Sequence, residues 1–270
     1  MRNCPPHNAL GDAIAHRNSS FRHLRASVQS IKESYPGQSN GTSSAASSMP
    51  EQATGSRMAG QNNRHPIFAR FYARLSVAME ADRTGPRRHS LLAGLSGSVL
   101  EVGAGNGLNF GHYPATVTSL LAVEPEPHLR ALAEQNARGA AIPITVTSGT
   151  AEQLPAGDQA YDAVVATLML CSVSSLGLAL SEMRRVLRPG GELRFMEHVR
   201  ADAPGERRIQ RIADAVGRPF CCGGCRTGRD SVGAIAAAGF SIKELTKYRL
   251  PDTRVPWPTA QHAQGIAVRV

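Results

Sequence analysis

From residue 98 onward, short apolar segments of β-strand character alternate with longer amphipathic segments. Strands and helices that take turns along a chain favour a mostly parallel sheet with helices on both faces. The sequence therefore predicts an α/β fold of the doubly wound, Rossmann-like kind. We expect strands at residues 98–102, 119–123, 144–147, 161–167, 192–197, 241–248 and 264–270, and helices at 127–138, 176–187, 205–216 and 229–238.

The first predicted strand runs into a glycine-rich turn, and residues 99–107 read VLEVGAGNG. Gly103, Gly105 and Gly107 let the backbone turn sharply and approach a ligand without a Cβ in the way. We expect the turn to open a helix whose free N-terminal amides face an anionic group. Such a turn alone does not separate a dinucleotide from S-adenosylmethionine (SAM).

An acidic residue, Glu124, closes the second predicted strand about twenty residues after the turn. At this position a carboxylate binds both hydroxyls of a ribose, and we favour that role over an exposed carboxylate at a strand end. The pair of signals predicts a nucleoside beside the sheet. Dinucleotide-dependent oxidoreductases share both signals, so an NAD-binding enzyme stays open at this point.

Further segments follow the turn in order and at regular intervals. They are Asn109-Phe110 with Tyr113-Pro114, then AEQLP at 151–155, TLMLCSV at 167–173, VLRPGG at 186–191, FMEHV at 195–199, and Gly224-Cys225 followed by Arg229. With the glycine turn, they make the chain from about Val99 to its end resemble the class I SAM-dependent methyltransferases with a methyltransferase type 11 domain. The resemblance is closest to the thiol S-methyltransferase-like group and more distant to the methyltransferases of ubiquinone and menaquinone biosynthesis.

The resemblance implies a seven-stranded sheet whose last strand runs antiparallel between its neighbours, with SAM as the cofactor. It places Gly103, Gly105 and Gly107 along the methionine and ribose, Glu101 near the methionine ammonium and Glu124 on the ribose hydroxyls. Adenine contacts fall on Thr150, Ala151 and Glu152. The sequence departs from the quinone-type relatives at Thr150, where they usually have aspartate, so Glu152 is a second candidate for the adenine contact.

For function, the resemblance implies transfer of a methyl group to a small-molecule acceptor, with a thiol ranked first and a quinone or lipid precursor second. Two other classes stay open, an NAD-binding oxidoreductase and a non-catalytic SAM-binding domain. The segments 151–152 and 187–191 count against the oxidoreductase. Methyl transfer draws much of its rate from positioning and removal of water, and a base helps when the acceptor must become an anion.

Candidate catalytic groups lie at the carboxyl ends of strands, where open α/β sheets bind ligands. Glu197 and His198 end the fifth predicted strand, and His198 either acts as a base or caps the strand exit. Cys225 is expected to line the acceptor pocket or pack a lid. Cys171, inside an apolar stretch, reads as a small buried hydrophobe. Cys221, Cys222 and Cys225 have no second Cys or His pair at zinc-site spacing, so no metal is predicted.

The bulk composition favours a small-molecule substrate over nucleic acid. The net charge is +9, but arginine supplies nearly all of the positive charge and is scattered along the chain without interleaved aromatics. No apolar run approaches the ~20 residues of a membrane-spanning helix, and peripheral membrane contact is not predicted. An odd count of 5 cysteines without regular spacing favours a reducing cytoplasm. Oligomeric state cannot be read from these features.

The chain divides into a tail and one domain. Residues 1–61 are rich in Ser, Asn, Gly and Gln and are expected to be disordered. The segment would also suit a transit peptide, but we favour a true start at Met58, with the residues before it untranslated. The methyltransferase domain is expected at 66–270. It opens with apolar residues at three-to-four residue spacing between Ile67 and Met79, which predicts an amphipathic helix that packs on the domain or serves as a substrate lid.

Overall fold

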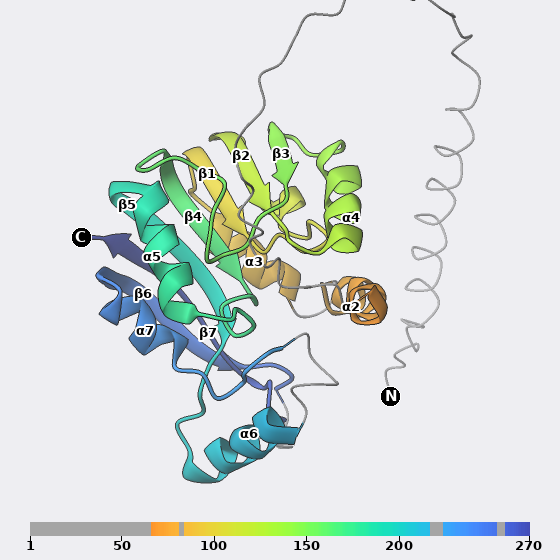
Figure 1. The fold of residues 1–270 in the computed structure, drawn as a ribbon, viewed down its shortest axis with the longest axis vertical. Helices are drawn as coiled ribbons and strands as arrows, with labels where there is room; N and C mark the ends of the chain where they lie inside the picture. The colour runs from red at the N-terminus through yellow and green to blue at the C-terminus, as the bar shows by residue number, and fades with distance from the viewer. Residues whose placement is uncertain (1–65, 81–83, 217–223, 253–256) are drawn as a thin grey trace, which may run out of the picture. The chain divides into compact units, whose positions relative to one another are not determined.

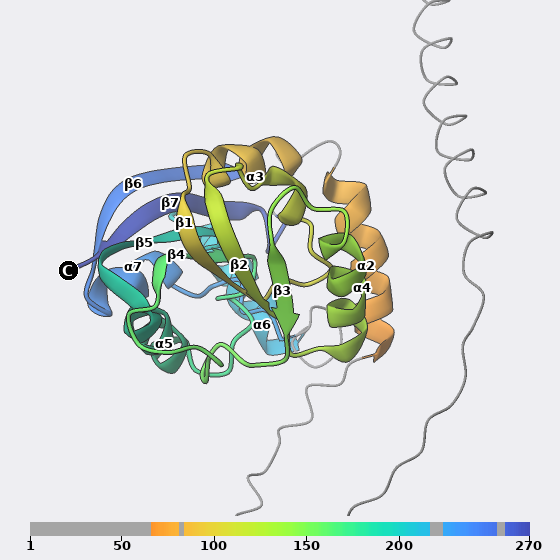
Figure 2. The same cartoon turned by 90° about the horizontal axis from the view of Figure 1, so that it is seen from above.

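The computed structural model describes residues 66–80, 84–216, 224–252 and 257–270, which all belong to the unit Ala59–Val270. The expectations for residues 1–61, for a start at Met58, and for Cys221 and Cys222 lie outside these residues. Within them, the predicted α/β architecture is confirmed: helices lie on both faces of one sheet (Figures 1 and 2).

The sheet has seven strands in the order β3-β2-β1-β4-β5-β7-β6. Neighbouring strands from β3 to β5 pair in parallel, whereas β7 lies antiparallel between β5 and β6, as predicted. The carboxyl ends of β1, β2, β4 and β5 therefore meet at one edge of the sheet. The strands are β1 (Gly97–Val102), β2 (Val117–Val123), β3 (Ile144–Thr147), β4 (Tyr161–Thr167), β5 (Leu187–His198), β6 (Phe240–Arg249) and β7 (Gln261–Arg269).

Six α-helices lie among the described residues and pack on opposite faces of the sheet. The helices α5 and α7 share one face, and α3 and α4 cover the other, with α2 against α4 (Figure 2). The predicted amphipathic helix near the start of the domain is confirmed as α2. The helices are α2 (Pro66–Met79), α3 (Gly85–Leu92), α4 (Pro127–Ala137), α5 (Leu176–Val186), α6 (Pro204–Val216) and α7 (Ser231–Ala237).

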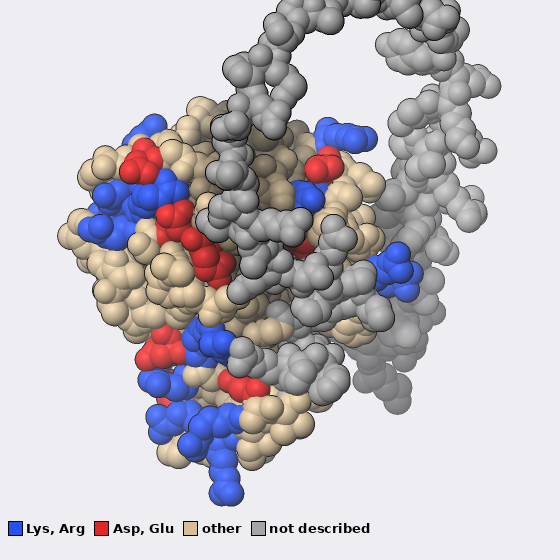
Figure 3. Space-filling model, in the orientation of Figure 1, with Lys and Arg blue, Asp and Glu red and all other residues tan. Residues whose placement is uncertain are grey.

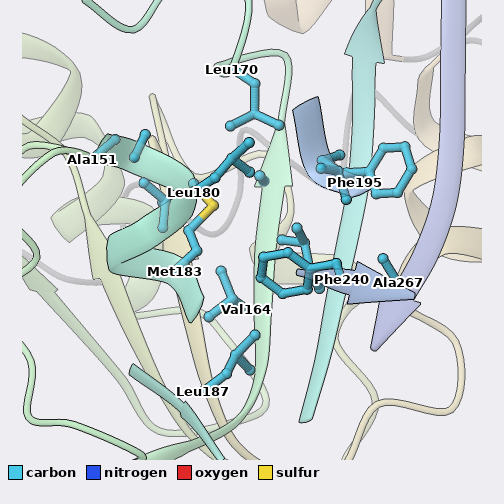
Figure 4. Packing of buried hydrophobic residues seen from close by; sticks show 14 of the residues in the cluster. Ala151, Val164, Leu170, Leu180, Met183, Leu187, Phe195, Phe240 and Ala267 are labelled. Atoms are coloured by element: carbon cyan, nitrogen blue, oxygen red, sulfur yellow. The ribbon is translucent and has the colours of Figure 1, made fainter. Parts of the chain in front are cut away.

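Two apolar cores result from the period of two along the strands. On β1, Leu100 faces the core beneath α5 and α7, whereas Val99 faces the core beneath α3 and α4. Figure 4 shows the first core, where Leu180 and Met183 of α5 lie against Val164 of β4. Burial on both faces explains why these strands read as continuous apolar runs in the sequence.

The helix expected directly after the glycine turn is absent, and that prediction is wrong. The turn leads into a short 3-10 helix, η2 (Phe110–His112), followed by Pro114. Gly107 has φ +79°, which no α-helix accepts in its first turn, and Asn109 precedes η2 with its side chain turned into the interior. The turn therefore offers single backbone amides to a ligand, without a helix dipole behind them.

Arginines gather around α6 more than their scatter along the sequence suggests. Figure 3 shows Lys and Arg side chains at the lower edge of the molecule, where α6 lies. Arg200, Arg207 and Arg211 line a groove of about 490 Å³ there, and none of the described residues that line it is aromatic. Among the described residues, no helix combines the length and the apolar character that a membrane crossing requires.

Candidate active site

The candidate site lies along the carboxyl edge of the sheet, where side chains from six strands form a row. Glu124 follows β2, the glycine turn follows β1, and the segment 168–171 follows β4. His198 ends β5, and its backbone pairs with that of His262 on β7. Since β1 lies between β2 and β4, the turn that we expect to bind the cofactor lies beside the segment after β4.

The three glycines of the turn have positive φ values, but for different local reasons. A Cβ at Gly103 would lie 2.9 Å from Cβ of Met169, and one at Gly107 would lie 2.6 Å from Cε2 of Phe110. Packing within the protein therefore excludes a side chain at both positions. At Gly105 (φ +57°) the nearest atom is Cε1 of Tyr72 at 3.8 Å, so the space before Gly105 is open. Such a cradle fits a ligand that approaches the backbone closely.

Glu124 points back toward this cradle. Its Oε2 accepts a hydrogen bond from the Gly105 amide at 2.8 Å, and its Oε1 accepts one from the Glu126 amide at 2.9 Å. The side chain is buried, and this burial raises the pKa of Glu124 above its ordinary value while the two amides oppose the rise. The carboxylate thus fixes the turn, and its role on the ribose hydroxyls stays a prediction.

Glu101 ends in a buried polar network beneath the turn. Its Oε1 accepts a hydrogen bond from Asn109 Nδ2 at 2.8 Å and its Oε2 accepts one from the Tyr113 hydroxyl at 2.8 Å. Arg88 in turn donates to Asn109 Oδ1 at 2.7 Å. Burial raises the pKa of Glu101 to about 7, although the bonds from Tyr113 and Asn109 lower it. A cation beside Glu101 would favour its ionised form.

The helix α2 packs beside the glycine turn, which agrees with the predicted packing role, while its role as a substrate lid stays a prediction. Asn106 Nδ2 donates to Ser76 Oγ at 3.3 Å, which joins the turn to the helix. Tyr72 of α2 lies across Gly105, and burial raises the pKa of its hydroxyl. Tyr72 was not predicted as a site residue, because an aromatic residue in an amphipathic helix is typical of ordinary packing.

The loop predicted to contact adenine is held by contacts of its own. Thr150 forms a bridge with Gln153, and Ala151 is buried in the core beneath α5. Glu152 Oε1 accepts hydrogen bonds from the amides of Ser174 and Ser175 at 2.8 and 3.1 Å, just before α5 begins. These bonds use one of the two carboxylate oxygens, and the adenine contacts of this loop stay predictions.

Glu197 has no exposed surface and binds backbone amides of the segment after β4. Its Oε1 accepts hydrogen bonds from Met169 N at 2.9 Å and Leu170 N at 2.8 Å, and its Oε2 accepts one from Cys171 N at 3.4 Å. Burial raises the pKa of Glu197 well above its ordinary value. The segment begins at Leu168, whose φ of +55° is unfavourable for a non-glycine residue. The carboxyl group therefore stabilises a strained turn.

The two remaining catalytic candidates, His198 and Cys225, come together with Cys171. Nδ1 of His198 lies 3.6 Å from Sγ of Cys171 and 3.6 Å from Sγ of Cys225. Both cysteines are free and buried. The bond from Cys225 and burial raise the pKa of Cys171 above its ordinary value. The predicted burial of Cys171 is confirmed, but its place in this cluster was not predicted.

A row of rings continues from this cluster across the sheet. The rings of His198 and His262 lie 4.6 Å apart, and Tyr248 of β6 stacks on His262 at 5.4 Å. The guanidinium of Arg87 lies over the Tyr248 ring at 3.5 Å. Burial lowers the pKa of His262 to about 4, so this histidine is neutral.

Comparison with known proteins agrees with this geometry. Residues 100–195 match a family described as Methyltransferase domain. Thiol S-methyltransferase TMT1A of Homo sapiens is 32% identical over 216 residues, which cover 75% of this chain and 86% of the relative. The chain belongs to the thiol S-methyltransferase family. Thiol S-methyltransferase TMT1B of Mus musculus is 36% identical over 187 residues, which cover 66% and 74% of the two chains. The family resemblance predicted from the sequence is thereby confirmed.

Solved structures confirm the fold of this thiol S-methyltransferase family member. A SAM-dependent methyltransferase from Thermotoga maritima has a TM-score of 0.56 at 19% identity and covers 76% of this chain and 98% of its own. Geranyl diphosphate methyltransferase in complex with SAM has a TM-score of 0.56 at 14% identity and covers 74% and 90%. The [4+2]-cyclase SpnF also matches, at a TM-score of 0.53 and 22% identity over 68% and 80% of the chains. The fold alone therefore does not decide the reaction.

Proposed function

We propose that this protein transfers the methyl group of SAM to the sulfur of a small thiol. The observation that carries the proposal is the similarity to thiol S-methyltransferase TMT1A, which extends over 75% of this chain and 86% of that relative. The buried free thiols of Cys171 and Cys225 are consistent with a reducing compartment, and we propose the cytoplasm. Residues 66–270 would form the methyltransferase domain.

The residues at the edge fit SAM as the cofactor. Gly105 leaves open space beside the backbone, and Glu124 holds a carboxylate next to it for the ribose hydroxyls. Glu101 supplies a buried carboxyl that a methionine ammonium would neutralise. Gly103 and Gly107 shape the turn, and Thr150, Ala151 and Glu152 would bound the adenine. A solved structure of the same fold contains SAM, which supports this choice of cofactor.

The acceptor would lie beside His198 and Cys225, one strand farther along the edge than the segment after β4. This position lets the acceptor approach the methyl group from the side opposite the glycine turn. We assign Glu197 a positioning role, because its carboxyl group binds three backbone amides and reaches no solvent. Loss of water from this edge would strengthen the nucleophile as well as the interactions around it.

Methyl transfer to sulfur is tested directly on the purified chain. We expect incubation with SAM and benzenethiol to give the methyl thioether and S-adenosylhomocysteine in equal amounts, measured by mass spectrometry. Phenol serves as the matched acceptor, since it differs only in oxygen for sulfur. Methylation of phenol without methylation of benzenethiol would contradict a thiol specificity, whereas SAM binding without any product would indicate a non-catalytic binding domain.

A second candidate acceptor is a quinone precursor. Demethylmenaquinone methyltransferase of Mycobacterium tuberculosis is 44% identical over 61 residues, which cover 23% of this chain and 26% of the relative. This span is much shorter than the similarity to the thiol S-methyltransferases, so the quinone acceptor ranks second. A reduced naphthoquinone included in the same assay distinguishes the two, because its product is methylated on carbon.

The affinity for SAM is expected to rise with pH through neutrality. The pKa of Glu101 is raised to about 7, so the carboxyl is mostly protonated at pH 6 and mostly ionised at about pH 7.5. Because the methionine ammonium would bind the ionised form, the association constant should increase about five- to ten-fold over this range. Calorimetric titration with SAM measures the rise. In a Glu101→Gln variant the rise should vanish; a flat profile in the parent protein would contradict the role of Glu101.

A further inference from the structure

The cluster at the end of β5 contains three atoms that soft metal ions prefer as ligands. Sγ of Cys171, Nδ1 of His198 and Sγ of Cys225 all lie within 4.8 Å of one another. They come from the segment after β4, from the end of β5 and from the segment after α6, so the fold assembles them across 54 residues of sequence. Thiolate and imidazole together are typical zinc ligands.

The two sulfur-to-nitrogen distances fit a tetrahedral ion. With Zn–S bonds of about 2.3 Å and Zn–N bonds of about 2.0–2.1 Å, tetrahedral angles separate sulfur from nitrogen by about 3.5–3.6 Å. Both Sγ-to-Nδ1 distances are 3.6 Å. Hydrogen bonding explains only one of them, because an imidazole nitrogen accepts a single bond along its lone pair. A cation between the three atoms accounts for both contacts at once.

The surrounding contacts hold the two cysteine segments in place relative to each other. The Arg226 amide donates to the Cys171 carbonyl at 2.8 Å. Arg229 Nη1 donates to the carbonyls of Leu170 at 2.6 Å and Val173 at 3.0 Å, and Glu197 binds the amides on the other side of the same turn. Cys171 and Cys225 are buried, whereas His198 is partly exposed. The three side chains are therefore held in place before any ligand binds, and the cluster can be reached from solvent at His198.

We propose that Cys171, His198 and Cys225 bind one Zn²⁺ ion, and that the sulfur of the acceptor thiol takes the fourth position. The inference rests on the proposed function for the acceptor, but the metal site stands on the three ligand atoms alone. Three protein ligands with an open fourth position are the usual arrangement of a catalytic zinc, and two Cys with one His form one known set. The sequence-based prediction of no metal would then be wrong, because it searched for ligand pairs close in sequence.

The site would activate the acceptor without a separate base. A thiol that binds Zn²⁺ is held as the thiolate, and its proton passes to solvent. A lone pair of the thiolate sulfur then forms the new bond to the methyl carbon as the bond from that carbon to the sulfonium sulfur breaks. The products are a neutral thioether and S-adenosylhomocysteine. A thioether is a weaker ligand than a thiolate, so the product leaves and the fourth position opens again.

Cobalt spectroscopy and metal analysis test the site without relying on activity. We expect the full chain, expressed in medium that contains zinc, to bind one Zn²⁺ ion per chain. Its Co²⁺ form should show a thiolate-to-cobalt charge-transfer band and the d–d absorption of a tetrahedral site. Loss of a residue that only hydrogen-bonds to a metal ligand weakens metal binding by about 10- to 100-fold. Loss of a ligand itself costs more, so Cys225→Ser and His198→Gln should weaken Co²⁺ binding by about 100-fold or more. Cys4→Ser, a cysteine outside the cluster, should change nothing. Cys171→Ser is less suitable, since that residue is fully buried.

The fourth position has its own readout. Addition of benzenethiol to the Co²⁺ form should add a charge-transfer band, whereas phenol should add none. Removal of zinc by a chelator should lower thiol methylation on the order of ten-fold or more, with recovery on adding Zn²⁺. A chain that binds no Zn²⁺ or Co²⁺ when reduced, or that joins Cys171 to Cys225 in a disulfide, overturns the site. Thiol methylation that is unaffected by metal removal overturns the metal inference but leaves the proposed function. A bound metal without any thiol methylation overturns the proposed function but leaves the metal site.

Discussion

Gly105→Arg is expected to weaken SAM binding by about 100-fold or more, which corresponds to about 3 kcal/mol. Of the three glycines in the turn, only Gly105 has open space beside it. A Cβ at this position would have Cε1 of Tyr72, at 3.8 Å, as its nearest atom. An arginine side chain would fill this space and place a third cation beside the sulfonium and the ammonium of SAM. Calorimetric titration with SAM, S-adenosylhomocysteine and NAD measures the loss.

The matched control is Gly94→Arg. Gly94 also has a positive φ, +76°, and its Cβ would meet nothing within 4 Å, but it lies before β1, at the opposite edge of the sheet. Both variants should lose about 1–2 kcal/mol of stability from the left-handed backbone, and only Gly105→Arg should lose SAM. Unchanged binding in Gly105→Arg would place the cofactor elsewhere, and binding of NAD alone by the parent protein would make the chain a dinucleotide-binding protein.

Much of the fold was predictable because it depends on local pattern. The strands β3 and β4 have the predicted bounds, 144–147 and 161–167, since apolar runs with turn residues at each end define a buried strand. The fifth strand is longer than predicted and begins at Leu187, because Leu187 pairs with Tyr161 across a register shift. No pattern in a single segment reveals a pairing with another strand.

The site was less predictable where it depends on contacts between distant segments. The glycine turn and Glu124 have fixed spacing and were found, whereas Cys171 lies in an apolar run and its contact with His198 exists only in the folded chain. The prediction of a helix after the turn was wrong for a local reason, because Gly107 has a positive φ.

Glu197→Ala is expected to reduce the free energy of unfolding by about 4 kcal/mol. The alanine leaves three backbone amides, those of Met169, Leu170 and Cys171, without their acceptor in a buried place. Each unsatisfied buried donor costs about 1–3 kcal/mol, and the turn that begins at Leu168, whose φ is +55°, loses the hydrogen bonds that hold its next three residues. Chemical denaturation of the purified protein measures the change.

The control for this variant lies on the same strand. Glu192 is a partly exposed carboxylate on β5 that pairs with Arg194, so Glu192→Ala should cost about 1 kcal/mol or less. Glu197→Gln separates positioning from catalysis. Its amide oxygen still accepts hydrogen bonds from the backbone amides of Met169 and Leu170, and the neutral side chain resembles the protonated carboxyl group that burial favours. A positioning role predicts near-parental turnover in Glu197→Gln. A stable variant whose turnover falls by about 100-fold or more would instead identify Glu197 as an acid–base group.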